Sequence, residues 1–251
     1  MIELKKVTAG YPSKTVLSEI SLSVPKGTLI SVIGKNGSGK STLLKTVIGI
    51  LPAKGGEMLV DGESELSRQS MAKKVSYLAQ GKSVSDMTVE QLVLHGRFPH
   101  LSYPRRYSKK DREISNAALR QMGIADIAGT PLSALSGGMR QKAYIAMALA
   151  QDTDYILLDE PTTYLDISNQ VELMKILRSL ADRGKGIVAV MHDLPLAFGF
   201  SDRIAVIKDA KIAAFDTPQK ICDSGIVQEV FGIDLQYSPA EKSYHYKYPS
   251  R

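Results

Sequence analysis

Cysteine is almost absent from this chain of 251 residues, because Cys222 is the only one. A single cysteine excludes an internal disulfide and a cysteine-based zinc site, and it is compatible with a reducing cytosol. Long apolar runs are also missing, since none approaches the ~20 residues that a membrane-spanning helix needs. Residues 1–6 lack the apolar core of a signal peptide. If this protein works at a membrane, we expect another chain to hold it there.

Internal repeats and low-complexity linkers are absent as well, and the remaining composition is that of an ordinary globular protein. Hydrophobic residues make up 43% of the chain and charged residues 23%. The length fits one large domain or a domain with a subdomain. A net charge of +6 suits binding to nucleic acid, to an acidic membrane surface or to nucleotide phosphates. A mild excess spread along the chain favours none of them.

The most informative stretch, residues 34–41, reads Gly-Lys-Asn-Gly-Ser-Gly-Lys-Ser and fits the Walker A pattern. The apolar residues 29–33 predict a buried strand before it, and residues 42–48 predict a helix after it. A glycine-rich turn in this setting points backbone N–H groups and the positive end of a helix at a phosphate. The alternative is an ordinary glycine-rich turn with one basic residue. It does not account for the strand before the loop and the helix after it.

The residue types in this loop suit a nucleoside triphosphate with Mg²⁺. Glycines let the backbone wrap closely around phosphates, because any Cβ would be in the way. Lys40 is expected to reach the β- and γ-phosphates, and the Ser41 hydroxyl to ligate Mg²⁺. The predicted ATP-binding residues of this segment are Gly34, Lys35, Asn36, Gly37, Ser38, Gly39, Lys40, Ser41 and Thr42.

Two adjacent carboxylates follow a second apolar strand, Tyr155-Ile156-Leu157-Leu158. The carboxyl ends of parallel strands are where open α/β sheets bind ligands, so both acids are expected to face the phosphate loop. Asp159 is placed to hold Mg²⁺, and Glu160 to orient and deprotonate a water that attacks the γ-phosphate. The alternative is that strand ends carry acids simply because they reach solvent.

The order of predicted elements indicates an α/β fold with a mostly parallel core sheet, because apolar strands alternate with helices. Segments 2–8, 20–24 and 57–60 predict antiparallel strands, with Tyr11 in a Gly-Tyr-Pro turn. Residues 85–135 show helical patterns only, which predicts a helical insertion. Near the end, 204–207 and 211–215 predict a hairpin that turns at Asp209 and Ala210. The tail, 244–248, predicts either an edge hairpin with 235–237 or a frayed terminus.

A third motif decides between these interpretations. Leu-Ser-Gly-Gly-Met-Arg-Gln, residues 135–141, opens a predicted helix, with Ser136 as N-cap and two glycines that expose the first N–H groups. Taken alone, Ser-Gly-Gly is typical of any capped helix. Placed between this Walker A loop and this Asp-Glu pair, the motif resembles the signature of ABC-type ATPases.

Four further residues match the pattern of that family, and their joint order makes the resemblance specific. By resemblance, Tyr11 stacks on adenine, Gln80 touches Mg²⁺ and relays to the partner, and His192 contacts the γ-phosphate. Asp166 belongs to the loop that communicates across the dimer, and Ser136, Gly137 and Gly138 bind ATP. The resemblance implies a P-loop NTPase of ABC ATPase type in a single domain, 1–251. Segments 1–84 and 152–251 form the nucleotide-binding core with an antiparallel β subdomain, and about 85–151 the helical subdomain.

Three segments, 96–100, 146–153 and 161–167, resemble ATPases of iron-siderophore, haem and cobalamin importers. Lys35 stands where a proline is common in the family, and Met139 where glutamine is common. The resemblance implies a head-to-tail homodimer that sandwiches two ATP molecules. It also implies permease chains docked on the insertion and on the loop after Gln80, at the cytoplasmic face of the inner membrane. A binding protein would deliver the cargo, and no nucleic acid is expected.

Two other functions compete with an importer ATPase. A soluble ABC protein without a permease, for example in cluster assembly, would share every motif, although the single cassette and the importer-like segments argue against it. A small-molecule kinase would explain the phosphate loop but neither the Ser136 motif nor His192. The transported compound is not encoded here, because the motor does not touch it.

Overall fold

A computed structural model of the chain describes residues 1–81 and 86–247. The chain divides into two compact units, of which the first combines residues 1–65 with 177–251 and the second spans residues 66–176. The predicted helical insertion, from about 85 to 151, falls within the second unit, and its boundaries stay a prediction. The loop after Gln80, expected to dock a permease, falls largely outside the described residues, as does Tyr248 of the tail.

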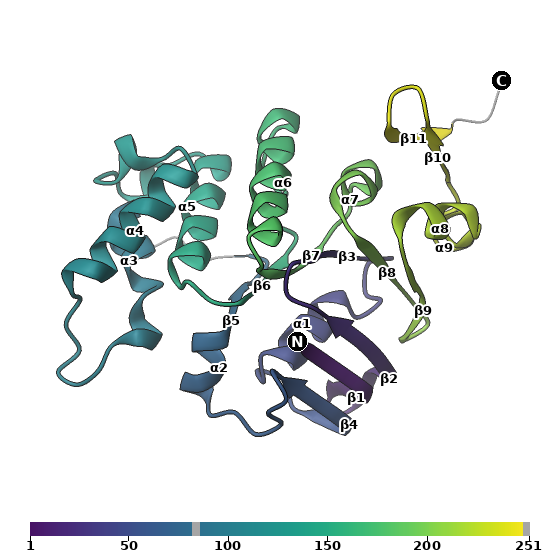
Figure 1. The fold of residues 1–251 in the computed structure, drawn as a ribbon, viewed down its shortest axis with the longest axis horizontal. Helices are drawn as coiled ribbons and strands as arrows, with labels where there is room; N and C mark the ends of the chain where they lie inside the picture. Colours follow the sequence, from purple (N-terminus) through teal and green to yellow (C-terminus); the bar gives the residue numbers. More distant parts are fainter. Residues whose placement is uncertain (82–85, 248–251) are drawn as a thin grey trace. The chain divides into compact units, whose positions relative to one another are not determined.

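An antiparallel sheet opens the first unit, with strand order β2-β1-β4 (Figure 1). Its strands are β1 (Ile2–Tyr11), β2 (Lys14–Val24) and β4 (Ala53–Val60). Burial of Ile20, Leu22 and Val24 confirms the predicted alternation in β2.

Two details of this sheet correct the sequence prediction. Tyr11 ends β1 instead of lying in the turn, which is formed by Pro12 and Ser13. Gly56 lies inside β4 rather than before it. Its φ is +82°, and a Cβ there would collide with the carbonyl of Lys6, so this glycine serves close strand approach rather than a turn.

The second sheet of this unit carries the phosphate loop. β3 (Leu29–Gly34) lies between β7 (Gly186–Val190) and β8 (Arg203–Lys208) and runs parallel to both. β9 (Lys211–Asp216) pairs antiparallel with β8 through the predicted turn, where Asp209 and Ala210 both have positive φ. All residues of β3 and β7 are buried, as expected for parallel strands covered on both faces.

Helices and a terminal hairpin complete the first unit. The helices are α1 (Lys40–Val47), α7 (Leu194–Phe200), α8 (Pro218–Asp223) and α9 (Ile226–Phe231). β10 (Asp234–Ser238) and β11 (Ser243–Lys247) pair in register, which confirms the predicted tail hairpin. α8 and α9 have only six residues each, too few for the sequence to show a helical period.

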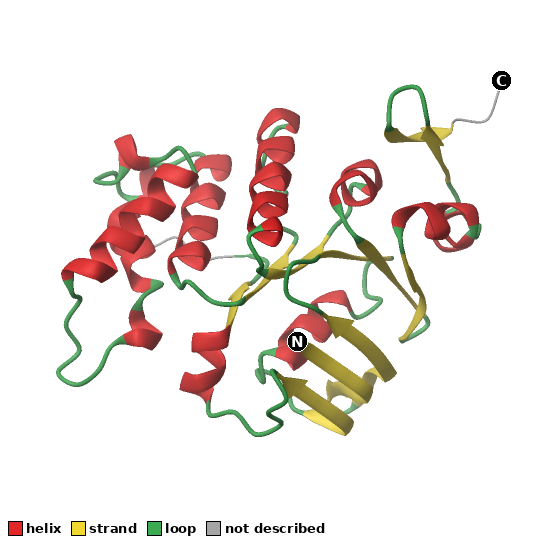
Figure 2. Cartoon of the chain, in the orientation of Figure 1, coloured by secondary structure: helices red, strands yellow, loops and turns green. Residues whose placement is uncertain are grey.

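Helices dominate the second unit (Figure 2). It contains α2 (Arg68–Lys74), α3 (Val89–His95), α4 (Lys109–Gln121), α5 (Gly137–Ala150), the start of α6 (Ile167–Asp182), and the parallel strands β5 (Val75–Leu78) and β6 (Tyr155–Asp159). Three 3₁₀ turns, Phe98–His100, Ala125–Ile127 and Leu132–Ala134, connect these elements. α3, α4 and α5 pack on one another. Within the described residues, no helix is long and apolar enough to cross a membrane.

Candidate nucleotide-binding site

The phosphate loop joins β3 to α1 and holds a buried lysine at its centre. Lys40 is the first residue of α1 and is only 6% exposed. Its ammonium group donates hydrogen bonds to the carbonyl oxygens of Gly34, at 2.8 Å, and Lys35, at 3.0 Å. Because Lys35 contributes its backbone to this contact, a lysine where proline is common leaves the contact intact. The loop therefore positions a cation at the start of a helix.

Glycines at two positions of the loop are required by its packing. A Cβ on Gly34 would lie 2.5 Å from the Ile207 oxygen, and one on Gly39 would lie 2.7 Å from the Leu17 side chain. Gly39 is also the N-cap of α1, with φ +106°, and no side chain caps the helix there. Gly39 therefore has no side chain with which to cap the first N–H groups of α1, as in an anion-binding helix start.

A cavity of about 440 Å³ lies beside this loop. Its lining residues are Lys14, Thr15, Val16, Lys35, Asn36, Gly37, Ser38, Ile207, Lys208, Asp209, Ala210, Glu229 and Val230. The Ser38 hydroxyl is buried and has no hydrogen-bond partner among residues 1–81 and 86–247, which is costly unless a ligand supplies one. The loop residues thus fit a phosphate group by charge, by glycine geometry and by an unsatisfied hydroxyl.

Three further predicted residues lie in the first unit. His192 is exposed and follows β7, directly before Asp193, the N-cap of α7. Tyr11 is 46% exposed at the end of β1, where a ring can receive a flat ligand. Thr42 is buried in the first turn of α1, and its carbonyl accepts a hydrogen bond from Thr46.

The two predicted carboxylates end β6 in the second unit and differ in environment. Asp159 is 2% exposed, and the Tyr77 hydroxyl donates to it at 3.3 Å. Glu160 has φ +53°, in the left-handed region that non-glycine residues seldom adopt. The Gln80 amide donates to the Glu160 carboxylate at 2.6 Å, so two residues singled out separately in the sequence are brought together.

The signature motif forms a capped helix start, as predicted. The Ser136 hydroxyl accepts from the backbone N–H of Met139 at 3.3 Å, and Gly137 and Gly138 form the first turn of α5. Because the cap uses the backbone of Met139, a methionine at this position leaves it intact. Tyr164 is 76% exposed, has φ +69° and packs against Gly137. A Cβ added to Gly137 would lie 3.4 Å from the Cβ of Tyr164.

Asp166 caps the first turn of α6. Its carboxylate accepts hydrogen bonds from the Asn169 backbone, the Ser168 hydroxyl and the Asn169 side chain, each at 2.8 Å. The backbone bond from Asn169 is the main cause that lowers the pKa of Asp166, so this group stays ionised. An acidic side chain at the start of a helix stabilises that helix, so Asp166 has a structural role whether or not it has a functional one.

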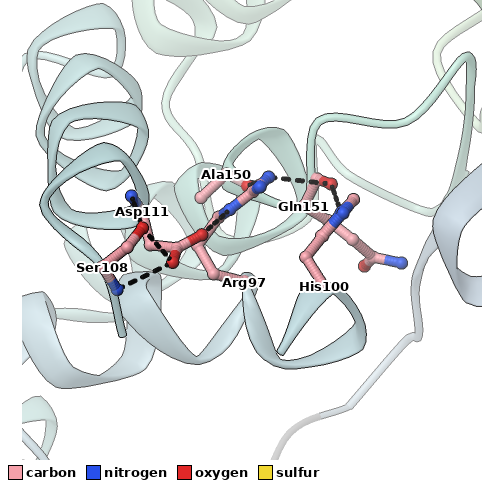
Figure 3. A network of polar contacts seen from close by, with 6 residues as sticks. All are labelled: Arg97, His100, Ser108, Asp111, Ala150 and Gln151. Atoms are coloured by element: carbon pink, nitrogen blue, oxygen red, sulfur yellow. Dashed lines mark hydrogen bonds and ion pairs between the residues drawn. The ribbon is translucent and has the colours of Figure 1, made fainter. Parts of the chain in front are cut away.

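The importer-like segment at 96–100 forms a buried polar network in the second unit (Figure 3). The Arg97 guanidinium donates to Asp111 at 3.0 Å and to the carbonyls of Ala150 and Gln151, which end α5. His100 also contacts the Gln151 carbonyl at 2.8 Å. Burial alone would raise the pKa of Asp111, but hydrogen bonds from Ser108 and Arg97 outweigh it and lower that pKa to about 2. This segment therefore fixes the far end of the helix that carries the signature motif.

Sequence reasoning missed part of the cavity wall. Lys14 and Lys208 add positive charge beside the loop, while Glu229 of α9 accepts a hydrogen bond from Lys208 at 2.6 Å. These residues come from three distant segments, and none lies in a recognisable motif. Only the fold brings them to the loop.

Comparison with known proteins agrees with this geometry. The family model described as ABC transporter matches residues 17–163. A petrobactin import ATP-binding protein of Bacillus anthracis is 41% identical over 241 residues, covering 94% of this chain and 88% of the relative. An iron(3+)-hydroxamate import ATP-binding protein of Bacillus subtilis is 38% identical over 239 residues, covering 94% and 89%.

A solved structure, that of a dimeric bacterial ABC transporter cassette, is also similar. It is 28% identical with a TM-score of 0.77, and the match covers 87% of this chain and 99% of that one. The same cassette has been solved in a post-hydrolysis state bound to ADP and Pi.

Proposed function

This chain belongs to the ABC transporter family, and we propose that it is the ATP-hydrolysing subunit of an importer for iron–siderophore compounds. The observation that carries the nucleotide site is the phosphate loop, with buried Lys40, a helix start without a side-chain cap and the unsatisfied Ser38 hydroxyl. The cargo class rests on relatives that are import ATP-binding proteins for petrobactin and iron(3+)-hydroxamate. Haem and cobalamin stay predictions.

In this proposal the first unit binds the nucleotide. Backbone N–H groups from Gly37 to Thr42 surround the β- and γ-phosphates, and the Lys40 ammonium neutralises their charge. Tyr11 stacks on adenine, and His192 reaches the γ-phosphate. The 440 Å³ cavity beside the loop supports this assignment, because Lys14 and Lys35 line it, while the charge of Lys208 is paired with Glu229.

The second unit supplies Gln80, Asp159 and Glu160 to hydrolysis, while Ser41 belongs to the phosphate loop of the first unit. Ser41, Asp159 and Gln80 would hold Mg²⁺, which neutralises charge on the phosphate oxygens when bound. Glu160 orients the attacking water and takes its proton. The 2.6 Å bond from Gln80 supports a fixed orientation for the Glu160 carboxylate.

Two copies are needed for the complete site. We propose a head-to-tail dimer in which Ser136, Gly137 and Gly138 of one copy close on ATP held by the other. Hydrolysis removes the γ-phosphate that joins the two copies, so the dimer opens. Permease chains at the cytoplasmic face of the membrane convert that opening into transport, and a binding protein delivers the cargo.

Glu160→Gln tests the hydrolytic assignment. We expect turnover to fall by more than about 100-fold, since the base is lost, while ATP affinity stays and a stable ATP-dependent dimer appears on gel filtration. Glu172→Gln, an exposed carboxylate on α6 paired with Lys142, is the matched control and should hydrolyse normally. Normal hydrolysis by Glu160→Gln would exclude Glu160 as the catalytic carboxylate.

The transport assignment has its own test. Deleting the gene should abolish growth on ferric siderophores as the only iron source, while growth on ferrous iron continues. Glu160→Gln should fail to restore uptake, and Glu172→Gln should restore it. Unchanged siderophore uptake in the deletion strain would contradict the cargo class but leave the ATPase assignment standing.

A further inference from the structure

The terminal hairpin has no role in the function proposed above, yet it contacts the helix that follows His192. The Tyr246 hydroxyl, on β11, lies 3.4 Å from the backbone nitrogen of Leu194, which donates to it. Leu194 is the first residue of α7 and lies two positions after His192. All of these residues belong to the first unit.

This hydrogen bond satisfies an N–H that the helix itself cannot. The first four N–H groups of a helix have no partner within it. The Asp193 carboxylate accepts from Leu196 at 2.8 Å, which satisfies the third. The acceptor for Leu194 comes from a tyrosine 52 residues further along the chain, so the hairpin completes the start of α7.

α7 is also held along its length. The ring of Phe198, 2% exposed, makes an edge contact with Tyr244 of β11 at 5.3 Å. At the other end, the Ser201 hydroxyl hydrogen-bonds that of Ser31 on β3 at 2.7 Å. The segment that carries His192 thus runs between a buried strand and a helix fixed at both ends.

We propose that Tyr246 is a positioning residue for His192: its hydrogen bond to Leu194 sets where the chain leaves β7 and hence where the imidazole meets the γ-phosphate. This inference rests on the role proposed above for His192. Because Tyr246 would act through Leu194 and His192, its loss should lower the rate of the chemical step rather than the affinity for ATP.

Tyr246→Phe removes only the hydroxyl and tests this directly. In the full-length protein we expect kcat to fall about threefold to tenfold, the effect of one lost hydrogen bond, with the KM for ATP unchanged and the melting temperature lowered by only a few degrees. Tyr244→Phe is the matched control, because it keeps the ring contact with Phe198 and loses only a 3.5 Å bond to Gln219. Unchanged kcat in Tyr246→Phe, or an equal loss in Tyr244→Phe, would overturn the proposal.

A double-mutant cycle separates positioning from general destabilisation. Single-turnover hydrolysis rates, followed over long times, are compared for His192→Ala with and without Tyr246→Phe. We expect the two proteins to hydrolyse ATP at the same rate, whereas two independent effects would add. Additive effects would overturn the proposal. If His192→Ala alone hydrolyses ATP normally, the proposed role of His192 is wrong and this inference falls with it. If His192→Ala is impaired and Tyr246→Phe is normal, only this inference fails.

Discussion

The starts of α1 and α5 are the two glycine-rich helix N-termini of this protein that are assigned to the same phosphates, and they are built differently. At α1 the N-cap is Gly39 with φ +106°, no side chain caps the helix, and Lys40 is buried with its charge held by two carbonyls. At α5 Ser136 caps the helix, and Gly137 and Gly138 have ordinary helical conformations beside the exposed Tyr164.

The difference fits two separate roles for the two helix starts. The α1 loop depends on glycine at fixed positions, because side chains at Gly34 or Gly39 would collide with the chain. All of its residues lie within one unit. The α5 start satisfies one of its own N–H groups through Ser136, which fits the proposed role of closing on ATP held by a second copy.

The largest expected effect is at Lys40. Lys40→Ala removes a buried charge that the rest of the loop is built to hold, and we expect ATP affinity to fall by about 100-fold or more by calorimetry, since a charge-assisted contact with phosphate is lost. Lys45→Ala, a basic residue in the last turn of the same helix, should bind normally. An unchanged affinity in Lys40→Ala would contradict the phosphate-loop assignment.

Gly137→Ala should separate the two helix starts. The added methyl group would lie 3.4 Å from the Cβ of Tyr164, so the fold tolerates it, but it covers N–H groups of the first turn. We expect turnover to fall by about tenfold or more, as when one oxyanion donor is lost, with monomer affinity for ATP unchanged. Gly129→Ala, where nothing lies within 4 Å, is the control. A loss of monomer affinity in Gly137→Ala would mean that α5 binds ATP within one chain.

The smallest effect concerns the opposite end of α5. The lowered pKa of Asp111, about 2, means that its ionised form stabilises the fold above the ordinary value of 3.8 and that this contribution is lost as pH falls toward 2. We expect about 1–2 kcal/mol of unfolding free energy to disappear between pH 5 and pH 2.5 in urea titrations. Asp111→Asn should lack this portion of the pH dependence, and an identical pH profile in both proteins would contradict it.

Local sequence predicted most of the fold because patterning and turn chemistry agree in this chain. The alternation in 20–24, the apolar residues of 29–33 and the Asp209–Ala210 turn each predict the structure found. The predicted strand at 57–60 was too short, because β4 begins at Ala53 and Gly56 within it permits close strand approach. The short helices α8 and α9 were missed because six residues do not establish a helical period.

The sequence predicted the motifs of the candidate site, but it did not predict the contacts between residues of different motifs. The phosphate loop and the Ser136 cap depend on neighbouring residues, so their local structure follows from the sequence. The bond between Gln80 and Glu160 joins residues 80 positions apart, and Tyr246 meets Leu194 from a segment outside every motif. Arg97 was recognised as importer-like, yet its structural role depends on Asp111 and on the end of α5.

The position of β3 between β7 and β8 has a consequence for synthesis on the ribosome. The phosphate loop is made early, but β7 begins at Gly186 and β8 ends at Lys208, so β3 cannot gain its neighbours until most of the chain has emerged. The second unit, a continuous segment in between, can fold first. A nascent chain released before β8 would carry all three nucleotide motifs and still lack the sheet that shapes the first of them. Nucleotide binding would thus distinguish finished chains from truncated ones.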